Sequence, residues 1–488
     1  MPPASRRQFL AGAAAIASAA LTGSQSASGA PRTPPNFLFI LVDDMGWRDL
    51  GCYGSSFYET PNIDRLATQS VRFTDAYAAC PVCSPTRASI LTGKYPARLH
   101  LTDWIPGRKQ WPTARLLTPA FEHELPLDEI TLPQLLKPLG YTSASIGKWH
   151  LGGPEFYPDK HGFDLNVGGT AKGQPASYFG PFHLPNLEGG SKDDYLTDRL
   201  SVEAEKFLEA NRSRPFFLYL PEFAVHMPLQ AKPGAIEHFE AKANPSAPQH
   251  DPVYAGMIAS LDENVGRILK KLDDLGLAER TIVFFMSDNG GVMYENKRKQ
   301  TVTSNAPLRG GKGHLYEGGI REPMMVRWPG VTKPGTVCHD PVISTDFFPT
   351  ILEMARLKID PKQPVDGRSL VPLLQGSGSL HRDAIYWHYP HYSNQGSVPS
   401  AAIRAGGYKL IEFYEDGRLE LYNLASDIRE ADNLAQRDPK RTAELKQKLR
   451  QWRAEVDASM PTPNPNYDPA TADQGLMGEN PPPAPGHR

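Results

Sequence analysis

The chain has 488 residues, a formal net charge of −2, 40% apolar residues and 22% charged residues. These values are typical of globular proteins and exclude wholesale disorder. They also argue against a nucleic-acid partner, because binding to phosphates needs a clustered basic excess. Four cysteines are too few for a disulfide scaffold, so the sequence predicts a large folded protein with an apolar core.

The first thirty residues are predicted to be an export signal rather than part of the fold. An arginine pair, Arg6-Arg7, precedes an apolar stretch at 10–21, and the small residues Ser28-Gly29-Ala30 follow it. This pattern is typical of a twin-arginine signal peptide. The apolar stretch is much shorter than the roughly twenty residues that span a bilayer. We therefore expect a periplasmic or secreted protein with no stable membrane insertion.

Four continuous apolar runs predict buried strands of a parallel sheet, and polar side chains follow each run. The runs are 36–42, 141–146, 215–220 and 281–286. The polar residues that follow them are Asp43 and Asp44, Lys148 and His150, His226, and Asp288 and Asn289. Ligands of open α/β sheets bind beyond the carboxyl ends of the strands, so we expect these side chains to form one site.

Helices alternate with these strands, and the pattern changes near residue 376. Apolar residues at helical spacing predict helices after Thr60-Pro61, at 254–275 and at 346–355. Beyond a Gly-Ser run, short strands are expected at 384–388, 408–413 and 419–422, and a helix at 439–456. We divide the chain into a signal peptide at 1–30, a catalytic domain at 31–376, a C-terminal α+β subdomain at 377–460 and a proline-rich tail at 461–488.

The motif Cys80-Pro81-Val82-Cys83 is compatible with several functions, because this spacing serves both zinc sites and redox dithiols. A zinc site needs two further thiol or imidazole ligands at a suitable spacing. The remaining cysteines, Cys52 and Cys338, are isolated, so the motif gives little support for zinc. A redox dithiol and a pair of buried core cysteines both remain open on this motif alone.

The residues after Cys83 favour a different chemistry. Cys83-Ser84-Pro85-Thr86-Arg87, followed by Leu91-Thr92-Gly93, resembles the sulfatase signature, with Thr86 where Ser is more frequent. Segments that resemble further landmarks of that family occur at 43–47, 147–152, 287–290, 308–313 and 316–323. The resemblance extends over roughly residues 35–435.

The resemblance implies a fold and a modified nucleophile. The fold is alkaline-phosphatase-like α/β, with a large mixed, mostly parallel sheet between helices and a smaller C-terminal antiparallel α+β subdomain. The resemblance also implies that Cys83 is oxidised to formylglycine by a formylglycine-generating or equivalent maturation enzyme. Cys83 is predicted to begin a helix, with Ser84 as its cap and Pro85 in the first turn, so that free helix N–H groups face an anionic sulfate.

Asp43, Asp44, Asp288 and Asn289 offer oxygen ligands, which suit a hard divalent ion and favour calcium over zinc. The resemblance likewise implies one calcium ion (Ca2+), with residue 83 among its ligands. For catalysis it implies that Asp288 accepts a proton from the nucleophile, that His226 or Lys312 protonates the departing alcohol, and that His150 accepts the proton that restores the aldehyde. It further implies that charge on the sulfate is stabilised by Arg87, Lys148 and Lys312.

Three functions are compatible with these residues. The first is a sulfuric ester hydrolase that acts on a carbohydrate or aryl sulfate. The second is a phosphonate or phosphate ester hydrolase of the same superfamily, and the third is an inactive glycan-binding relative, against which the complete set of site residues argues.

Loops at 104–121, 157–187 and 388–399 are long and rich in aromatic residues, so they are expected to bind the sugar. The resemblance to arylsulfatase A-like bacterial glycan sulfatases suggests a galactose- or N-acetylgalactosamine-type sulfate.

Overall fold

The structure is a computed structural model that describes residues 34–187, 189–293, 302–360 and 362–472. The predicted signal peptide and the end of the proline-rich tail lie outside the described residues. Within these ranges, no helix combines the length and the apolar character needed to cross a bilayer.

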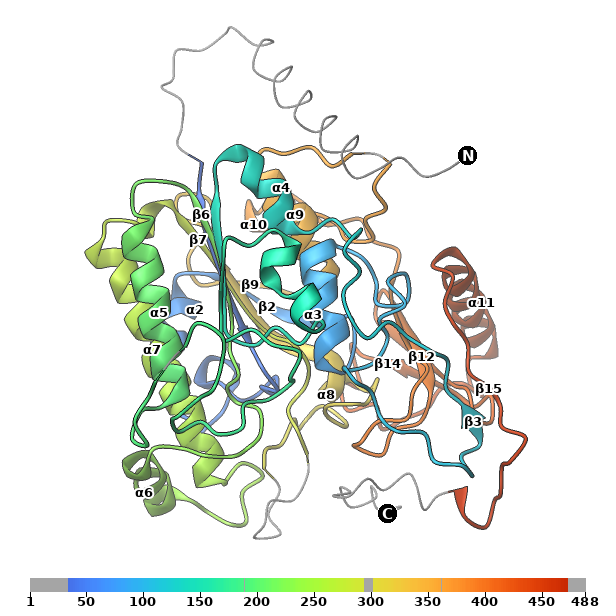
Figure 1. Ribbon diagram of the computed structural model, residues 1–488. Helices are drawn as coiled ribbons and strands as arrows, with labels where there is room; N and C mark the ends of the chain where they lie inside the picture. Colours follow the sequence, from blue (N-terminus) through green and yellow to red (C-terminus); the bar gives the residue numbers. More distant parts are fainter. Residues whose placement is uncertain (1–33, 188, 294–301, 361, 473–488) are drawn as a thin grey trace, which may run out of the picture.

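A mixed sheet forms the centre of the molecule (Figure 1). In the described ranges its strands run in the order β10-β2-β8-β7-β1-β6-β4-β5, and β9 also pairs with β2. The pairs from β7 to β5 are parallel, whereas β8 is antiparallel to both β7 and β2. The strands are β1 (Asn36–Val42), β2 (Val71–Tyr77), β4 (Thr142–Ile146), β5 (Leu165–Val167), β6 (Phe216–Pro221), β7 (Thr281–Ser287), β8 (Arg321–Arg327), β9 (Thr336–Cys338) and β10 (Val342–Ile343).

The register of the central strands aligns their carboxyl ends. Val42 at the end of β1 pairs with Ser287 at the end of β7, and Leu41 pairs with Pro221 at the end of β6. The residues that follow these strands therefore leave the sheet at one edge. The four predicted strands are confirmed, with boundaries that differ by one residue or less.

Helices cover both faces of the sheet, and β1 shows why its sequence is apolar at every position. One face carries α2 (Pro61–Thr68), α5 (Leu196–Ala210), α6 (Pro233–Lys242) and α7 (Pro252–Asp274), and the other carries α3 (Cys83–Thr92), α4 (Leu132–Leu136), α9 (Phe347–Met354) and α10 (Val371–Leu374). Leu38 and Ile40 enter the first core, whereas Phe37 and Phe39 enter the second. A strand buried on both faces has no solvent side on which polar residues would alternate.

A smaller antiparallel sheet lies on the C-terminal side, in the order β11-β12-β13-β14. The aromatic and aliphatic side chains of this sheet form a separate core with α11 (Pro439–Glu455). A buried ion pair joins the two parts, because Lys409 Nζ lies 2.9 Å from a carboxylate oxygen of Glu317. The strands are β11 (Ile385–Tyr389), β12 (Ser400–Ala405), β13 (Tyr408–Phe413) and β14 (Leu419–Asn423). The expected α/β fold class is confirmed.

Four local features differ from the sequence-based expectations. The sheet is mixed as expected, but the sequence predicts no strand at the antiparallel β8 or at β12. The helix expected at 254–275 is α7, which begins earlier, because Asp251 caps it by accepting hydrogen bonds from the N–H groups of Val253 and Tyr254. In the segment expected to be an irregular tail, β15 (Thr462–Pro463) pairs with β3 (Leu116–Leu117).

Candidate active site

Cys83 is the first residue of α3 and is 2% exposed, at the N-terminal end of that helix. The predicted helix start is confirmed, but the predicted cap is wrong. Val82 occupies the N-cap position, and the Ser84 hydroxyl lies inside the first turn, where it accepts a hydrogen bond from the N–H group of Ile105 at 3.2 Å. Ser84 therefore ties the helix to the 104–109 loop instead of capping it.

The acidic residues meet at the edge formed by β1 and β7. The N–H group of Asp44 donates to Asp288 Oδ1 at 3.2 Å, and Asn289 Nδ2 donates to Asp44 Oδ1 at 2.8 Å. Asp44 has a φ of 62°, a backbone conformation that non-glycine residues rarely adopt and that is frequent at functional sites. The two pairs of polar residues are thus brought together as expected.

Two buried oxygens of this group lack a hydrogen-bond donor among the described residues, namely Asp43 Oδ1 and Asn289 Oδ1. Ligand-capable atoms of Asp43, Asp44, Cys83 and His226 lie within 4.8 Å of one another. Buried polar atoms without partners are rare in folded proteins, and a hard cation satisfies carboxylate and amide oxygens. The donor set therefore fits the calcium ion that the resemblance implies, and His226 is an additional member of the cluster.

Three cations balance the three acids. Lys148 Nζ lies 2.8 Å from Asp43 Oδ2, and Lys312 Nζ lies 2.6 Å from Asp44 Oδ1 and 3.5 Å from Cys83 Sγ. Arg87 donates two charge-assisted hydrogen bonds to the same oxygen, Asp288 Oδ2, from Nε at 2.9 Å and from Nη2 at 2.7 Å. The cations thus lie around the reactive position, where they can hold an anion.

The first two carboxylates titrate in opposite directions. Burial raises the pKa of Asp43 to about 8, although Lys148 opposes this shift. Burial also acts on Asp44, but Lys312 and His226 together lower the pKa of Asp44 below its usual value. Burial raises the pKa of the Cys83 thiol above its ordinary value, against the effect of Lys148 and Lys312.

The two histidines each have one ring nitrogen bound to a backbone carbonyl. His150 Nε2 donates to the carbonyl of Ile105, whereas its Nδ1 is buried and has no partner among the described residues. His226 Nδ1 donates to the carbonyl of Met227 at 3.0 Å, and its Nε2 lies 3.5 Å from Asp44 Oδ2. Burial lowers the pKa of His150 well below its usual value, so the imidazole is neutral and Nδ1 carries a free lone pair.

A cavity of about 1140 Å³ opens above these residues. Its base includes Cys83, His150, His226 and Lys312. Its walls come from all three of the loops that the sequence predicted to bind a sugar, through residues 104–109, 171–176 and 394–395. Every predicted catalytic residue therefore lies at or directly beneath one cavity.

The sequence does not predict the residues that fix His150. These are Ile105, whose carbonyl accepts from His150 Nε2, and Gly173, where a Cβ atom would lie 2.5 Å from the imidazole. A backbone acceptor can belong to any residue type, so the Ile105 contact has no sequence signature. The C-x-x-C pair does not form a disulfide, since both cysteines are free thiols, and the Cys80 thiol faces the carbonyl of Thr102 at 3.9 Å.

The family model described as Sulfatase matches residues 35–357, which include every predicted catalytic and metal-binding residue. The chain belongs to the sulfatase family. As a sulfatase it is a sulfuric ester hydrolase. A second model, described as N-sulphoglucosamine sulphohydrolase, C-terminal, matches residues 311–456.

The curated relatives that match this sulfatase are named for different substrates. Mouse steryl-sulfatase is 34% identical over 457 residues, which cover 77% of this chain and 71% of the relative. Human N-acetylgalactosamine-6-sulfatase is 36% identical over 387 residues, which cover 74% of this chain and 69% of the relative. Bovine arylsulfatase A is 35% identical over 443 residues, covering 85% and 81%.

Solved structures extend the similarity to nearly the whole chain. The crystal structure of Ps i-CgsB has a TM-score of 0.75 and 29% identity, and the match covers 91% of this sulfatase and 98% of that chain. Ps i-CgsB in complex with k-i-k-neocarrahexaose has a TM-score of 0.73 and 29% identity, covering 91% and 97%. A phosphonate monoester hydrolase of Agrobacterium radiobacter, at 21% identity and a TM-score of 0.61, shares the fold.

Proposed function

We propose that this sulfatase removes sulfate from a sulfated carbohydrate, with Cys83 converted to formylglycine and one calcium ion bound. The observation that carries the proposal is that Cys83 begins α3 beside Lys312, at the base of a cavity that three loops surround. Human N-acetylgalactosamine-6-sulfatase and the oligosaccharide complex of Ps i-CgsB support a carbohydrate substrate. An aryl sulfate is the simpler alternative substrate.

The calcium ion would be held by Asp43, Asp44, Asp288, Asn289 and residue 83, and it would supply Lewis-acid polarisation of the sulfate, while the hydrated aldehyde supplies the nucleophilic oxygen. Lys148 and Lys312 hold the sulfate oxygens, assisted by the free N–H groups at the start of α3. Arg87 fixes Asp288 by two hydrogen bonds to Oδ2, so that the carboxylate can accept the proton of the attacking hydroxyl.

The remaining proton steps belong to the residues around the cavity base. His226 or Lys312 protonates the departing sugar oxygen, since both line the cavity next to Cys83. His150 accepts a proton at Nδ1, the ring nitrogen that the Ile105 contact leaves available. His150, His226 and Lys312 all line the cavity together with Cys83, as these steps require.

Substrates with different leaving groups can show whether His226 or Lys312 is the acid. A sugar alkoxide needs a proton as it departs, whereas a nitrophenolate needs little help. We expect the variant that removes the true acid, His226→Ala or Lys312→Ala, to lose roughly 10²-fold or more in kcat on a sugar sulfate and much less on nitrophenyl sulfate. Equal losses on both substrates would assign the residue to sulfate binding instead.

The first test of the proposal is product and peptide analysis. Purified protein should release sulfate from a panel of position-defined sulfated mono- and disaccharides, beginning with galactose and N-acetylgalactosamine derivatives. Peptide mass spectrometry should find Cys83 lighter by the difference between a thiol and an aldehyde. An intact thiol at position 83 in active enzyme contradicts the proposed nucleophile.

Hydrolysis of phosphonate or phosphate esters is the second candidate, favoured by the fold shared with phosphonate monoester hydrolase. Sulfate and phosphate esters are both tetrahedral and differ mainly in charge, so comparison of nitrophenyl sulfate with nitrophenyl phosphonate separates the two activities. We expect faster turnover of the sulfate. The inactive glycan-binding alternative fails as soon as either ester is hydrolysed.

We also propose export through the twin-arginine route, on the strength of Arg6-Arg7 and the short apolar stretch after them. Proteins that fold before export can have Cys83 converted in the cytoplasm, before an oxidising compartment traps it with Cys80. Replacing both arginines by lysine should retain the protein in the cytoplasm, as measured by fractionation. Export of the double variant at the normal level would contradict this route.

A further inference from the structure

The mouth of the active-site cavity carries several basic side chains, whereas the charges at its base are paired. At the base, Lys312 is paired with Asp44, whose carboxylate is the only one among the described lining residues. At the mouth, Arg108, Lys109 and Lys172 line the same cavity, and the two lysines are exposed. Asp103, which is buried behind this wall, interacts with Arg108, whereas the exposed Lys109 and Lys172 face a part of the described lining that contains no acid.

Both basic loops are attached to His150. The carbonyl of Ile105, three residues before Arg108, accepts the hydrogen bond from His150 Nε2 at 2.5 Å. On the other side, a Cβ atom at Gly173 would lie 2.5 Å from His150 Cε1, so the segment that carries Lys172 packs directly on the imidazole. The cations are thus carried by backbone that is fixed to the reaction centre.

The third loop holds Arg108 in place. Arg108 Nη1 donates to the carbonyl of Ser393 at 2.7 Å, and the guanidinium carbon lies 4.9 Å from the centre of the Trp111 ring. Ser393 directly precedes Asn394 and Gln395, which line the cavity with uncharged amides. The mouth therefore combines three cations with hydrogen-bonding groups that suit sugar hydroxyls.

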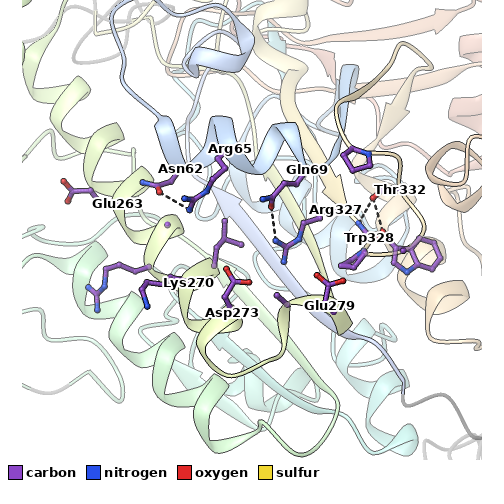
Figure 2. A pocket seen from close by; sticks show the side chains of 17 residues that line it. Asn62, Arg65, Gln69, Glu263, Lys270, Asp273, Glu279, Arg327, Trp328 and Thr332 are labelled. Carbon is purple, nitrogen blue, oxygen red and sulfur yellow. Dashed lines mark hydrogen bonds between the residues drawn. The ribbon is translucent and has the colours of Figure 1, made fainter.

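A second cavity shows that this charge is not a general property of the surface. It measures about 1070 Å³ and lies at the opposite edge of the sheet, between α2, α7 and the chain that follows β8 (Figure 2). Its cations alternate with the acids Glu263, Asp273 and Glu279. Two of these cations are paired, since Arg267 lies 3.0 Å from Glu205 and Lys270 lies 2.6 Å from Asp274.

We infer that the mouth of the active-site cavity is a binding subsite for a second anionic group, a sulfate or a carboxylate, on the same sugar as the scissile sulfate or on its neighbour. This inference rests on the proposed hydrolysis of a carbohydrate sulfate. Positive charges around an open cavity attract an anionic substrate and orient it, and fixed loops reduce the entropic cost of that orientation. The preferred substrate is therefore a polyanionic glycan fragment rather than a monosulfated sugar.

Matched disaccharides test this subsite. Each set shares one scissile sulfate ester and carries a second sulfate, a uronic acid carboxylate or a hydroxyl at the neighbouring position. We expect kcat/KM to be about tenfold higher for the dianionic members, mainly through KM, and this preference to shrink at high ionic strength. Lys109→Ala/Lys172→Ala should reduce the preference to about twofold or less, and the sulfate and carboxylate arms identify the second group.

The control variant removes the same charge elsewhere. Lys270→Ala/Lys333→Ala also deletes two lysines, of which Lys270 lines the second cavity and the exposed Lys333 lies between its lining residues Thr332 and Pro334, and this variant should keep the full preference. Equal kcat/KM for dianionic and monoanionic members, or an equal loss of preference in the control, overturns the subsite. Failure of the enzyme to hydrolyse any sulfated sugar, with Cys83 converted and calcium bound, refutes the proposed function instead.

Discussion

The two large cavities of this sulfatase have similar volumes, about 1140 and 1070 Å³, yet they differ in where their charges come from. At the base of the active-site cavity, the charges come from the ends of neighbouring parallel strands, from α3 and from Lys312, and they are buried and pair with one another; the exposed cations of its mouth come from loops. The second cavity receives most of its charges from the exposed surfaces of α2 and α7 (Figure 2). Volume alone therefore does not identify a reactive site, whereas buried charge held by aligned strand ends does.

The comparison is sharpest at atoms without partners. In the active site, the oxygens Asp43 Oδ1 and Asn289 Oδ1 accept no hydrogen bond from the described residues, although Arg87 Nη2 lies 3.6 Å from Asp43 Oδ1, and both oxygens suit a cation. In the second cavity, Arg327 Nε and Nη2 are buried without a hydrogen-bond acceptor among the described residues, while its Nη1 donates to Gln69. The first pair is accounted for by a ligand that the family implies. For the second pair, burial lowers the pKa of Arg327, and Asp273 and Glu279 only partly oppose this shift.

Removal of the candidate nucleophile should have the largest effect. We expect Cys83→Ala to reduce sulfate release by roughly 10⁴-fold or more, because the covalent route is lost while sulfate binding remains. Cys338→Ala, a cysteine on β9 outside the cavity, should keep full activity. Turnover of Cys83→Ala above about one per cent of the original would show that the chemistry does not depend on this residue.

Loss of a metal ligand should have the second-largest effect on activity. We expect Asn289→Ala to lower kcat by roughly 10²-fold and to lower bound calcium, measured by atomic emission after dialysis, because its free carbonyl oxygen is removed. Asp273→Asn in the second cavity should leave both quantities unchanged. Full calcium occupancy in Asn289→Ala would remove this residue from the ligand set.

A matched pair of glycine substitutions compares the packing of the two cavities. Gly173→Ala places its Cβ 2.5 Å from His150, and Gly266→Ala places its Cβ 2.5 Å from Asn62 in the second cavity. We expect the first to lower kcat by about tenfold, because it displaces the catalytic imidazole. The second should lower the free energy of unfolding by about 1–3 kcal/mol and leave kcat unchanged, measured by chemical denaturation and steady-state kinetics. An unchanged kcat in Gly173→Ala would show that the loop, rather than the imidazole, moves aside.

Replacement of Arg327 should have the smallest effect. We expect Arg327→Met to leave kcat/KM unchanged and to shift the free energy of unfolding by about 1 kcal/mol or less, because the lost Gln69 contact is offset by the removal of a poorly satisfied buried charge. Urea unfolding and the nitrophenyl sulfate assay measure the two quantities. A large loss of activity in Arg327→Met would show that the second cavity, like the first, contributes to catalysis.

The sequence predicted the central strands well because they are buried on both faces. Continuous apolar runs of this kind leave few alternatives, and the acids, lysine and histidines after them could be assigned to one edge. It predicted α7 less accurately at its start, where a cap at Asp251 decides the boundary. The antiparallel strand β8 was not recognised, because its charged and proline residues conceal a strand that neighbouring strands bury.

The residue pattern was sufficient to propose the chemistry at the base of the cavity, because Cys83, the paired acids and the lysines are residue types that the proposed reaction requires. How these groups are held depends on the folded structure. It brought His226 within 3.5 Å of Asp44, assigned Ser84 to the 104–109 loop, and used the carbonyl of Ile105 to orient His150. Such contacts join segments that are far apart in the chain and often use backbone atoms, so no residue pattern encodes them. For the same reason the sequence did not predict the basic mouth, because its three cations come from two loops that both contact the His150 imidazole.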